Sequence, residues 1–596
     1  MCGIAGELGF GGRPPESSVM QRMLDRLRRR GPDHEGHYRQ GPVLLGHRRL
    51  AIIDLSAAAD QPMTDEATGS TIVFNGTIYN YPALRNELIG RGHRFRSSGD
   101  TEVILKAYAE WGERCVERLI GMFAFAIWDV REQRLFLARD RLGIKPLYYG
   151  ETRDGFRFAS NVQALLAGGG VDSAIDPIAL HHHMSLHAVV PAPRTLLKGV
   201  RKLPPAHTLS IGPDGRQQLR AYWHLSAQRP AAPRSEQDWV EAIHAALRTA
   251  VERRMRIADV PVGVLLSGGL DSSLLVALLA ESGASGLKTF TVGFEDQPEE
   301  KGSEFEYSDP VAARYATEHH KFEIPNSEVL TRLPEAVDQM SEPMVAQDAV
   351  AFYLLSGQVS RHVKAVQSGQ GADEVFGGYF WYPQMAAAQG EPIERFRPRY
   401  FDRDHAEYLR TVMPAYATDD VTSAFVAARL AEADADEFID QVLRFDVTTL
   451  IVDDPVKRVD NMTMAWGLEA RVPFLDHELV ELAASMPPDL KLRDGGKYVL
   501  KQIARGRIPD AVIDRPKGYF PVPALKYVRG EAYDFMADIV NSRTSRERGL
   551  FRPEYVDALL ADPEGEGSFT AIRGNKLWHL ALLELWLQRH LDGAVY

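Results

Sequence analysis

The sequence contains few cysteines and no long apolar run. Only Cys2 and Cys115 occur among 596 residues, too few for a disulfide framework. No stretch approaches the roughly 20 apolar residues that a membrane-spanning helix needs. The N-terminus shows no basic segment followed by an apolar one, as a secretory leader would. We therefore expect a protein of the reducing cytoplasm, without a membrane partner.

The chain also lacks an excess of positive charge. Its formal net charge is −12, whereas binding to nucleic acid depends on clustered Lys and Arg. We expect no nucleic-acid partner and interpret the acidic balance as a source of solubility. The composition, 45% hydrophobic and 25% charged, is typical of a folded globular protein. A length of 596 residues exceeds what one hydrophobic core usually serves, so two or more domains are expected.

The first half of the chain has the pattern of a β-rich domain. Short alternating apolar runs are separated by Gly and Pro turn signals over the first ~210 residues. Strands are predicted at Val43–Leu45, Ser70–Asn75, Phe123–Asp129, Arg134–Arg139 and Phe156–Ser160. The pattern changes in a polar, proline-bearing stretch between Gly212 and Glu236. We predict a domain at 1–215, a linker at 216–235 and a second domain at 236–596.

The second half alternates apolar, strand-like runs with longer helical patterns. This alternation favours a parallel sheet with helices on both faces and ligands at the carboxyl ends of the strands. Strands are predicted at Pro261–Leu266, Thr289–Phe294, His320–Ile324 and Val363–Gln367, and helices at Ser272–Glu281, Asp309–Glu318 and Val350–His362. The part from about Gly377 onward is mostly helical in pattern.

The first chemical signal is Cys2, in the sequence Met-Cys-Gly-Ile-Ala-Gly. Removal of Met1 would give Cys2 a free α-amine with a reference pKa near 8 beside its own thiol. Such an amine can take the thiol proton, and the thiolate can attack a carboxamide and release ammonia. Taken alone, Cys2 could equally be an accidental cysteine.

Further segments, in order over about 150 residues, resemble the glutaminase domain of class II glutamine amidotransferases of the asparagine synthetase type. They begin at Arg30, Gly46, Phe74, Gly99 and Arg139 and read RGPD, GHRRLAIID, FNGTIYN, GDTE and RDRLGIKPLY. The resemblance implies an N-terminal-nucleophile (Ntn) αββα sandwich of the α+β class. It also implies that this domain binds glutamine and releases ammonia from it.

The same resemblance implies roles for individual residues. Arg49 would bind the glutamine α-carboxylate, as suits a guanidinium, and Asp100 would bind the α-ammonium. Asn75 and Gly76 would form the oxyanion hole. Thr77 departs from the Glu found in many asparagine synthetases, and it can hydrogen-bond the ammonium without adding charge.

The second strong signal is a glycine-rich turn between an apolar strand and a helix, Val264-Leu-Leu-Ser-Gly-Gly-Leu-Asp-Ser-Ser273. Backbone N–H groups at such a turn favour an anion. No Gly-Lys-Ser or Gly-Lys-Thr follows, so it is not a Walker A loop. It resembles the pyrophosphate loop of ATP pyrophosphatases, which implies a Rossmann-like α/β domain, continued by helices, that uses ATP. An ordinary strand-turn-helix is the alternative.

Other segments resemble the rest of that synthetase domain and imply its ligands. ATP would contact Leu265, Ser267, Gly268, Gly269, Asp271, Ser272, Val292, Ser368 and Gly369. Asp271 and Asp373 would hold Mg²⁺, whose hard octahedral shell prefers carboxylate and phosphate oxygens. Lys497 would stabilise charge on the phosphate. The segment Asn461–Asp476 matches a further family segment in the interior of this domain.

The acceptor is the point at which the sequence departs from asparagine synthetases. Gln370 stands where those enzymes carry Glu, and the segments Leu186–Thr195 and Ser341–Tyr353 resemble the branch named N-acetylglutaminylglutamine amidotransferase. That branch amidates a capped dipeptide to make an osmoprotectant. Amidation of this dipeptide, synthesis of asparagine from aspartate, and a glutaminase or binding module with a silent second domain remain the three candidate functions.

Two features favour plain structural roles. Cys115 lies on a predicted amphipathic helix, where a free cysteine usually packs as a small hydrophobic residue. The triplet His181–His183 suggests a metal site, but three consecutive residues point in different directions and cannot converge on one ion. We expect small-molecule partners, namely glutamine, ATP and a carboxylate acceptor, and a homodimer remains an open expectation.

Overall fold

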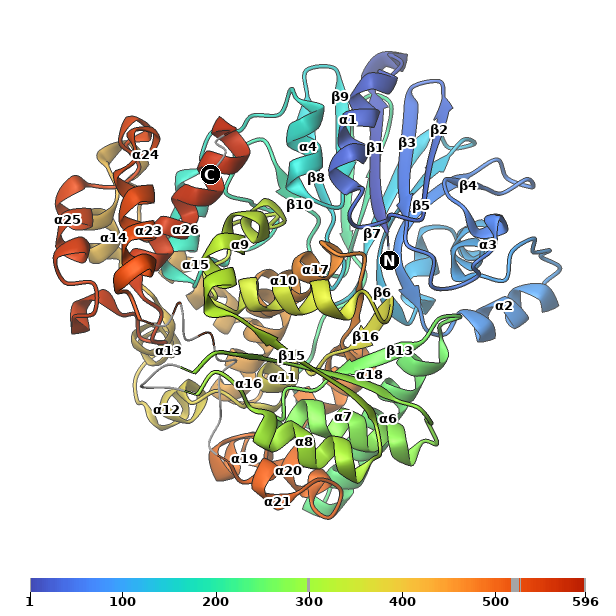
Figure 1. Cartoon of the computed structure of the whole chain (residues 1–596). Coiled ribbons are helices and arrows are strands. Elements are labelled where there is room, and N and C mark those ends of the chain that lie inside the picture. Colours follow the sequence, from blue (N-terminus) through green and yellow to red (C-terminus); the bar gives the residue numbers. More distant parts are fainter. Residues whose placement is uncertain (1, 297–300, 516–521, 523–524, 526, 594–596) are drawn as a thin grey trace.

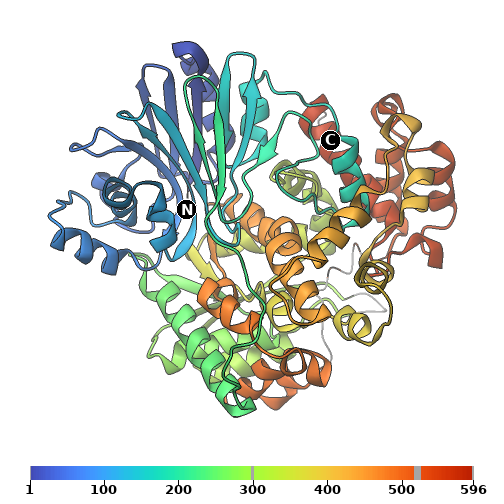
Figure 2. The same cartoon turned by 180° about the vertical axis from the view of Figure 1, so that it is seen from behind.

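The computed structural model describes residues 2–296, 301–515, 522, 525 and 527–593. Figure 1 shows a β-rich N-terminal half with its strands upright, next to a second half built on a parallel sheet that is surrounded by helices. The view from behind shows the same two halves in broad contact (Figure 2). This division confirms the predicted two-domain architecture.

Two six-stranded sheets form the N-terminal half. The first has the order β10 (Arg201–Lys202), β8 (Tyr148–Thr152), β9 (Gly155–Ala159), β1 (Gly3–Gly9), β3 (Val43–Arg49) and β2 (His34–Gln40). The second has the order β12 (Gln217–Ala221), β11 (His207–Ile211), β7 (Arg134–Arg139), β6 (Gly121–Asp129), β5 (Thr71–Ile78) and β4 (Met63–Thr64). Their pairings are antiparallel.

Helices cover the outer faces of both sheets. The helices α1 (Ser17–Leu27) and α4 (Val162–Gly168) pack on the first sheet, and α2 (Tyr81–Gly90) and α3 (Asp100–Trp111) lie over the second. Alternate side chains of the strands, such as Ile4, Val73 and Trp128, form the core between the sheets. This is the αββα sandwich that the sequence resemblance implies. The helix α5 (Pro177–Ser185) then leads toward the second half.

The second half is organised around a five-stranded parallel sheet. Its order is β15 (Glu318–Ile324), β14 (Lys288–Phe294), β13 (Val262–Leu265), β16 (Ala365–Gln367) and β17 (Glu469–Arg471). After β13 the chain builds one side of the sheet with β14 and β15, and later it returns to the other side with β16. The loops after β13 and β16 therefore flank a topological switch point, where ligands bind in such sheets.

Helices cover both faces of this sheet. One face carries α6 (Glu236–Arg256), α7 (Leu270–Glu281) and α8 (Phe305–Arg314), and the other carries α9 (Asn326–Asp338), α10 (Asp348–Val359) and α17 (Lys457–Met464). The apolar residues of α7 are buried on all sides, as expected of a helix between other layers.

The remainder is helical, as the sequence pattern predicts. Its helices are α11 (Ala372–Phe376), α12 (Trp381–Ala387), α13 (Pro392–Tyr400), α14 (His405–Thr411), α15 (Val421–Leu430), α16 (Phe438–Phe445), α18 (His477–Ala484), α19 (Asp489–Leu492), α20 (Tyr498–Ala504), α21 (Asp510–Ile513), α23 (Gly530–Asn541), α24 (Arg543–Arg548), α25 (Pro553–Ala561) and α26 (Lys576–Leu587). Within the described ranges, none of the helices is long and apolar enough to cross a membrane.

The segment 216–235, predicted as a linker, is partly ordered structure. Its strand β12 completes the second sheet of the sandwich by pairing with β11, and Ser235 caps the first turn of α6 through its hydroxyl. The hairpin of β11 and β12 therefore places residues up to Ala221 with the sandwich. The exact domain boundary stays a prediction.

Candidate active sites

Cys2 is buried at the start of β1, in contact with the neighbouring sheet. Its backbone N–H donates to Asn75 Oδ1 at 3.0 Å, and its carbonyl accepts from Arg30 Nε at 3.3 Å. Burial raises the pKa of the thiol, although a backbone hydrogen bond from Leu50 and the charge of Arg49 act in the opposite direction. The backbone of Cys2 is therefore held in place, and the nearby cationic and N–H groups only partly offset the effect of burial on the thiol.

Asn75 and Gly76 lie side by side on β5, opposite Cys2. The bond from Cys2 N–H fixes Asn75 Oδ1 as the acceptor, so Nδ2 is turned the other way, and Nδ2 is buried with no partner among the described residues. A buried donor kept without a partner is costly unless a ligand uses it. A Cβ atom at Gly76 would lie 2.2 Å from the Met122 carbonyl, so only glycine allows β5 to approach β6 there.

Arg49 ends β3 and is almost fully buried. Its Nη1 donates to Asp60 Oδ1 at 2.7 Å and to the Ser56 carbonyl at 2.9 Å, and its Nη2 donates to the Asp54 carbonyl. A carboxylate ligand that binds this guanidinium through both oxygens would therefore have to displace Asp60 from it.

Asp100 begins α3 and accepts the Ile78 N–H at 3.0 Å. Burial raises the pKa of Asp100 to about 6, and the charge of Glu469 contributes in the same direction. A cationic ligand beside this carboxyl would restore the ionised form. The predicted partner Thr77 is buried on β5, and its hydroxyl donates to Glu469, with distances of 3.3 and 3.4 Å to the two carboxylate oxygens.

Glu469 brings a carboxylate from the second half of the chain into this site. It is fully buried on β17, where Arg471 Nε donates to it at 2.5 Å. Burial alone would raise the pKa of Glu469, but Arg471 and Lys145 help to lower it to about 2. Glu469 is thus ionised next to Thr77, the position at which the sequence lacks the negative charge found in many asparagine synthetases.

The glycine-rich loop joins β13 to α7 at the switch point of the parallel sheet. Ser267 N–H donates to Ser272 Oγ at 3.2 Å, and Gly269 N–H donates to Ser267 Oγ at 3.3 Å. Gly268 has φ +76°, and a Cβ atom there would lie 2.9 Å from Ser308 N. The turn therefore requires glycine, and it leaves the hydroxyls and the start of α7 directed at the cavity.

Lys497 connects the two predicted metal-binding carboxylates. Its Nζ lies 2.5 Å from Asp271 Oδ2 and 2.8 Å from Asp373 Oδ1. Burial lowers the pKa of Lys497, but the two carboxylates outweigh this effect and raise it above its usual value. Lys497 itself has a left-handed backbone, φ +55°, at the start of α20. A lysine and two carboxylates thus meet over the glycine-rich turn.

A cavity of about 1360 Å³ extends from this loop. Its wall includes nearly all of the predicted nucleotide, metal and acceptor residues, namely Leu265, Ser267, Gly269, Asp271, Ser272, Val292, Ser368, Gly369, Gln370, Asp373 and Lys497. Gly268 is not part of the wall and shapes the turn behind it. The wall also includes Tyr379, Trp381, His187, Asp348 and Trp578.

A buried ion network joins the two sites across the domain boundary. Arg30 donates from Nη1 to Asp460 Oδ2 at 2.8 Å and from Nη2 to Oδ1 at 3.3 Å, while its Nε holds the Cys2 carbonyl. Lys145 Nζ also donates to Asp460 Oδ1, at 3.3 Å. Asp460 lies on α17, and Arg458 on the same helix lines the cavity.

Sequence reasoning did not single out Glu469, Asp460 or Arg30 as site residues. Glu469 lies within the segment Asn461–Asp476, and Asp460 directly precedes it. Arg30 belongs to the RGPD motif. The motifs could be recognised in the sequence. Nothing in the sequence indicated that Arg30 pairs with Asp460 or Thr77 with Glu469, because the partners are hundreds of residues apart.

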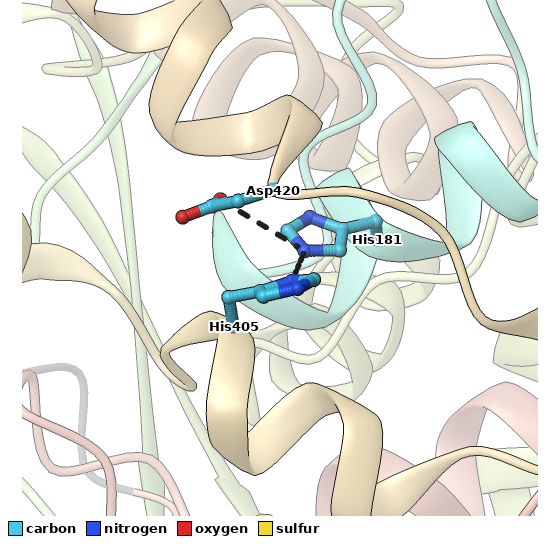
Figure 3. A group of neighbouring side chains, drawn as sticks. All are labelled: His181, His405 and Asp420. Atoms are coloured by element: carbon cyan, nitrogen blue, oxygen red, sulfur yellow. Dashed lines mark hydrogen bonds and ion pairs between the residues drawn. The ribbon is translucent and has the colours of Figure 1, made fainter.

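The histidine triplet does not form one cluster. His181 Nε2 lies 3.1 Å from His405 Nδ1 and 4.0 Å from Asp420 Oδ1 (Figure 3). Burial lowers the pKa of His181 to about 4, so the imidazole is neutral. Asp420 Oδ1 also caps α15 by accepting Ser423 N–H, and none of the three residues lines the cavity. Cys115 is fully buried in the core beneath α3.

An Ntn sandwich with an N-terminal cysteine, joined to a sheet with a pyrophosphate-type loop, defines a glutamine-dependent amidotransferase of the carbon–nitrogen ligase type. Comparison with known proteins gives the family. A glutamine amidotransferase domain model matches residues 1–223, and an asparagine synthase model matches residues 242–588. The chain therefore belongs to the glutamine-hydrolysing asparagine synthetase family.

Relatives match over the whole length. Glutamine-hydrolysing asparagine synthetase 1 of Bacillus subtilis (strain 168) is 32% identical over 98% of this chain and 96% of its own. Glutamine-hydrolysing asparagine synthetase 3 of the same organism is 31% identical over 99% of each chain. Glutamine-hydrolysing asparagine synthetase 1 of Lotus japonicus is 30% identical over 87% of this chain and 75% of its own.

Proposed function

We propose that this enzyme hydrolyses glutamine at Cys2 and transfers the ammonia to the adenylated carboxylate of N-acetylglutaminylglutamine, with release of AMP and pyrophosphate. The observation that carries the choice of acceptor is the cavity wall. His187, from the segment Leu186–Thr195, and Asp348, from the segment Ser341–Tyr353, line the same cavity as the pyrophosphate-type loop. These are the two segments whose sequence resembles the dipeptide-amidating branch.

In the glutaminase step, the Cys2 thiolate attacks the glutamine carboxamide carbon. The carbon–sulfur bond forms, the carbon–nitrogen bond breaks, and ammonia leaves after protonation by the α-amine of Cys2. Asn75 Nδ2 and the Gly76 N–H donate to the oxyanion. Water then hydrolyses the thioester to glutamate. Arg49 holds the substrate α-carboxylate, and Asp100 holds its α-ammonium.

The charge of Glu469 supports this second contact. Thr77 bonds Glu469, and both lie beside Asp100, so the synthetase half supplies a carboxylate near the ammonium position. An ammonium between Asp100 and Thr77 would be stabilised by two nearby negative charges. This arrangement offers a physical reason why Thr is tolerated at position 77.

In the synthetase step, an oxygen of the acceptor carboxylate attacks the α-phosphorus of ATP, and the bond to pyrophosphate breaks. Ammonia then attacks the acyl carbon, and AMP leaves. Ser267, Gly268, Gly269 and Ser272 bind the pyrophosphate, and Leu265, Val292, Ser368 and Gly369 contact the adenosine. Lys497 stabilises the negative charge that develops on the phosphate.

The carboxylates of Asp271 and Asp373 fit a magnesium ion. Both carboxylates face the cavity, and both bind the ammonium group of Lys497, so they already stabilise a positive charge between them. Hard carboxylate oxygens beside phosphate are the donor set that Mg²⁺ takes. When bound there, Mg²⁺ would neutralise charge on the phosphates.

The size of the cavity allows ATP and an acceptor to bind together. Its volume of about 1360 Å³ exceeds the roughly 300 to 1,000 Å³ of a typical single-ligand pocket. Its wall includes Tyr379, Trp381 and Trp578 in addition to the nucleotide loop. Gln370 lies near the reacting end, where its amide can both donate to and accept from the amides of a peptide.

Asparagine synthesis from aspartate is the second candidate, because the whole-length relatives carry that name. The deciding experiment incubates the purified enzyme with glutamine, Mg-ATP and either N-acetylglutaminylglutamine or aspartate, with mass detection of the products. We expect the dipeptide amide as the main product. Efficient asparagine formation with an inert dipeptide would reject this acceptor, and glutamate formation without any amide would indicate a silent second domain.

A further inference from the structure

One wall of the synthetase cavity comes from the N-terminal half of the chain. His187 follows the end of α5 by two residues, and its side chain, 15% exposed, lines the cavity. His187 and Ala188 both have a left-handed backbone, with φ +52° and +63°. Residues other than glycine adopt this conformation at a cost, and it persists only where surrounding contacts compensate. The imidazole is therefore held at the cavity by the fold.

A buried carboxylate fixes the orientation of this imidazole. Asp402, whose side chain is fully buried, places Oδ2 3.2 Å from His187 Nδ1 and 3.4 Å from His579 Nδ1. Because an ionised carboxylate only accepts hydrogen bonds, His187 donates from Nδ1. The opposite ring nitrogen, Nε2, is then the one directed away from Asp402 and able to reach a ligand.

The surrounding charges favour protonation of this imidazole. Burial lowers the pKa of His187, but Asp402 and Asp454 outweigh that effect and raise it above its usual value. Burial lowers the pKa of the second imidazole, His579, well below its usual value, so His579 is neutral. When His187 is protonated, Nε2 carries a second N–H that can donate to a ligand.

His187 and Lys497 line the same cavity but have different charged neighbours. Lys497 pairs with Asp271 and Asp373. His187 instead bonds Asp402 and feels the charges of Asp454 and Arg458. We therefore assign a group bound at His187 to a part of the acceptor other than its reacting carboxylate.

We propose that His187 is a specificity-determining residue of the acceptor site, where its Nε2–H donates a hydrogen bond to a carbonyl oxygen of the acceptor's acyl or amide groups, and that Asp402 is its positioning residue. The inference rests on the proposed function, because it requires an acceptor that extends beyond the reacting carboxylate.

The charged groups around His187 already pair with one another. Asp402 is stabilised by His187 and Arg403, and Arg458 is paired with Asp348 at 3.1 Å. A further buried charge would need a partner of its own, which makes it costly. A neutral carbonyl oxygen can accept a hydrogen bond here without that cost.

The test compares His187→Leu, which removes the donor, with His187→Gln, whose amide can donate in its place. With N-acetylglutaminylglutamine as acceptor, we expect His187→Leu to raise the KM for the dipeptide about 10-fold to 100-fold, the range for a hydrogen bond to a charged donor. The KM for glutamine should change far less, and His187→Gln should recover part of the loss. His224→Leu, at a surface position 82% exposed, is the matched control.

The outcomes separate the inference from the proposed function. If the wild-type enzyme fails to amidate the dipeptide, the proposed function fails. If it succeeds and His187→Leu keeps a dipeptide KM within twofold of wild type, the assignment of His187 is wrong. A third outcome would also overturn it. His187, Asp402 and His579 could together hold a metal ion, and a stoichiometric transition metal in the purified enzyme, lost in His187→Leu, would show a metal ligand instead.

Discussion

At the residue scale, the proposed chemistry depends on the sulfur of Cys2. Replacing Cys2 by Ala removes the nucleophile but leaves the synthetase cavity, which contains no part of β1, unaltered. We expect Cys2→Ala to abolish glutamine-driven amidation and to retain amidation driven by ammonium chloride. Amide product is measured with each nitrogen source. The control is Cys115→Ala, in the core under α3, and glutamine-driven turnover by Cys2→Ala would exclude Cys2 as the nucleophile.

Asp100 gives a pH dependence to glutamine binding. Burial raises its pKa to about 6, above that of an exposed carboxyl, so the ionised fraction falls as the pH drops through 6. The ionised form is the one that binds an ammonium. In the Cys2→Ala background, which prevents turnover, we expect the Kd for glutamine to rise about tenfold per pH unit below this value.

Calorimetric titration of the enzyme with glutamine between pH 5 and 8 measures this effect. The lower limit lies about one pH unit below the pKa of Asp100, and the upper limit about two units above it. Asp100→Asn in the same background should bind weakly at every pH, because it carries no titrating carboxylate. If the Kd for glutamine of the Cys2→Ala enzyme, which keeps Asp100, does not depend on pH, then Asp100 does not bind the ammonium.

At the element scale, the glycine-rich turn after β13 determines where the phosphates can lie. Gly268→Ala places a methyl group 2.9 Å from Ser308 N on a backbone with φ +76°. We expect the strain, about 1–3 kcal/mol, to displace the turn and raise the KM for ATP about tenfold or more. Initial rates of pyrophosphate release at varied ATP measure it.

A matched control lies just beyond the other end of the same helix. Gly283, just after α7, has a similar φ of +82°, but a Cβ atom there meets nothing within 4 Å. Gly283→Ala carries the same backbone penalty without disturbing the turn, so its melting temperature should fall while the KM for ATP stays near wild type. Equal effects of the two variants on the KM would show that the turn is not the cause.

The sequence predicts elements well where one local pattern decides them. The strand-turn-helix around Ser267 and Gly268 is contiguous, so its residues and their position at the switch point could be read directly. β17 is only three residues long, and its pattern gave no strand signal, yet it contributes Glu469 to the proposed glutamine site. Such a contact depends on the packing of two domains, which local propensity does not encode.

At the scale of the whole molecule, the type of nucleotide cleavage follows from the loop and its partners. Turnover should release AMP and pyrophosphate. Asp271→Asn and Asp373→Asn should each stop this release, because Lys497 loses a charged partner and the phosphates lose a carboxylate-held cation. Glutamate formation from glutamine should remain measurable.

Phosphate assays with and without added pyrophosphatase distinguish the products. Asp309→Asn serves as the control, since Asp309, on nearby α8, pairs with Lys321 and His319 and does not line the cavity. Detection of ADP and orthophosphate as the first products would contradict the adenylation mechanism.

The connection between the two sites is the part of the molecule that the sequence did not reveal. Arg30 and Asp460 are 430 residues apart; Arg30 lies in, and Asp460 directly before, a segment that was identified for its own domain only. The fold and the motifs could be predicted because each depends on a pattern of residues that are close together in the sequence. The bridge could not, because it is a pairing of buried charges formed only when the domains dock.

Asp460→Asn tests whether this bridge holds the nucleophile in place. In the wild type, the carboxylate of Asp460 binds two nitrogens of Arg30, and Arg30 Nε holds the Cys2 carbonyl. The Asn side chain offers one acceptor oxygen where Asp offers two, and it carries no charge, so Arg30 and Lys145 are left buried with less compensation. Breaking a buried pair in this way costs about 3–5 kcal/mol.

We expect Asp460→Asn to lower kcat/KM for glutamine at least tenfold and to reduce the ratio of amide formed to glutamate formed, while ammonium-driven amidation falls less. The control is Lys364→Gln, which removes a pair with Asp33 across the same domain boundary. That pair is partly exposed, and exposed pairs contribute about 0–1 kcal/mol, so this variant should stay near wild type. If Asp460→Asn reduces both nitrogen sources equally, Asp460 supports the fold of the whole molecule and has no particular connection to Cys2.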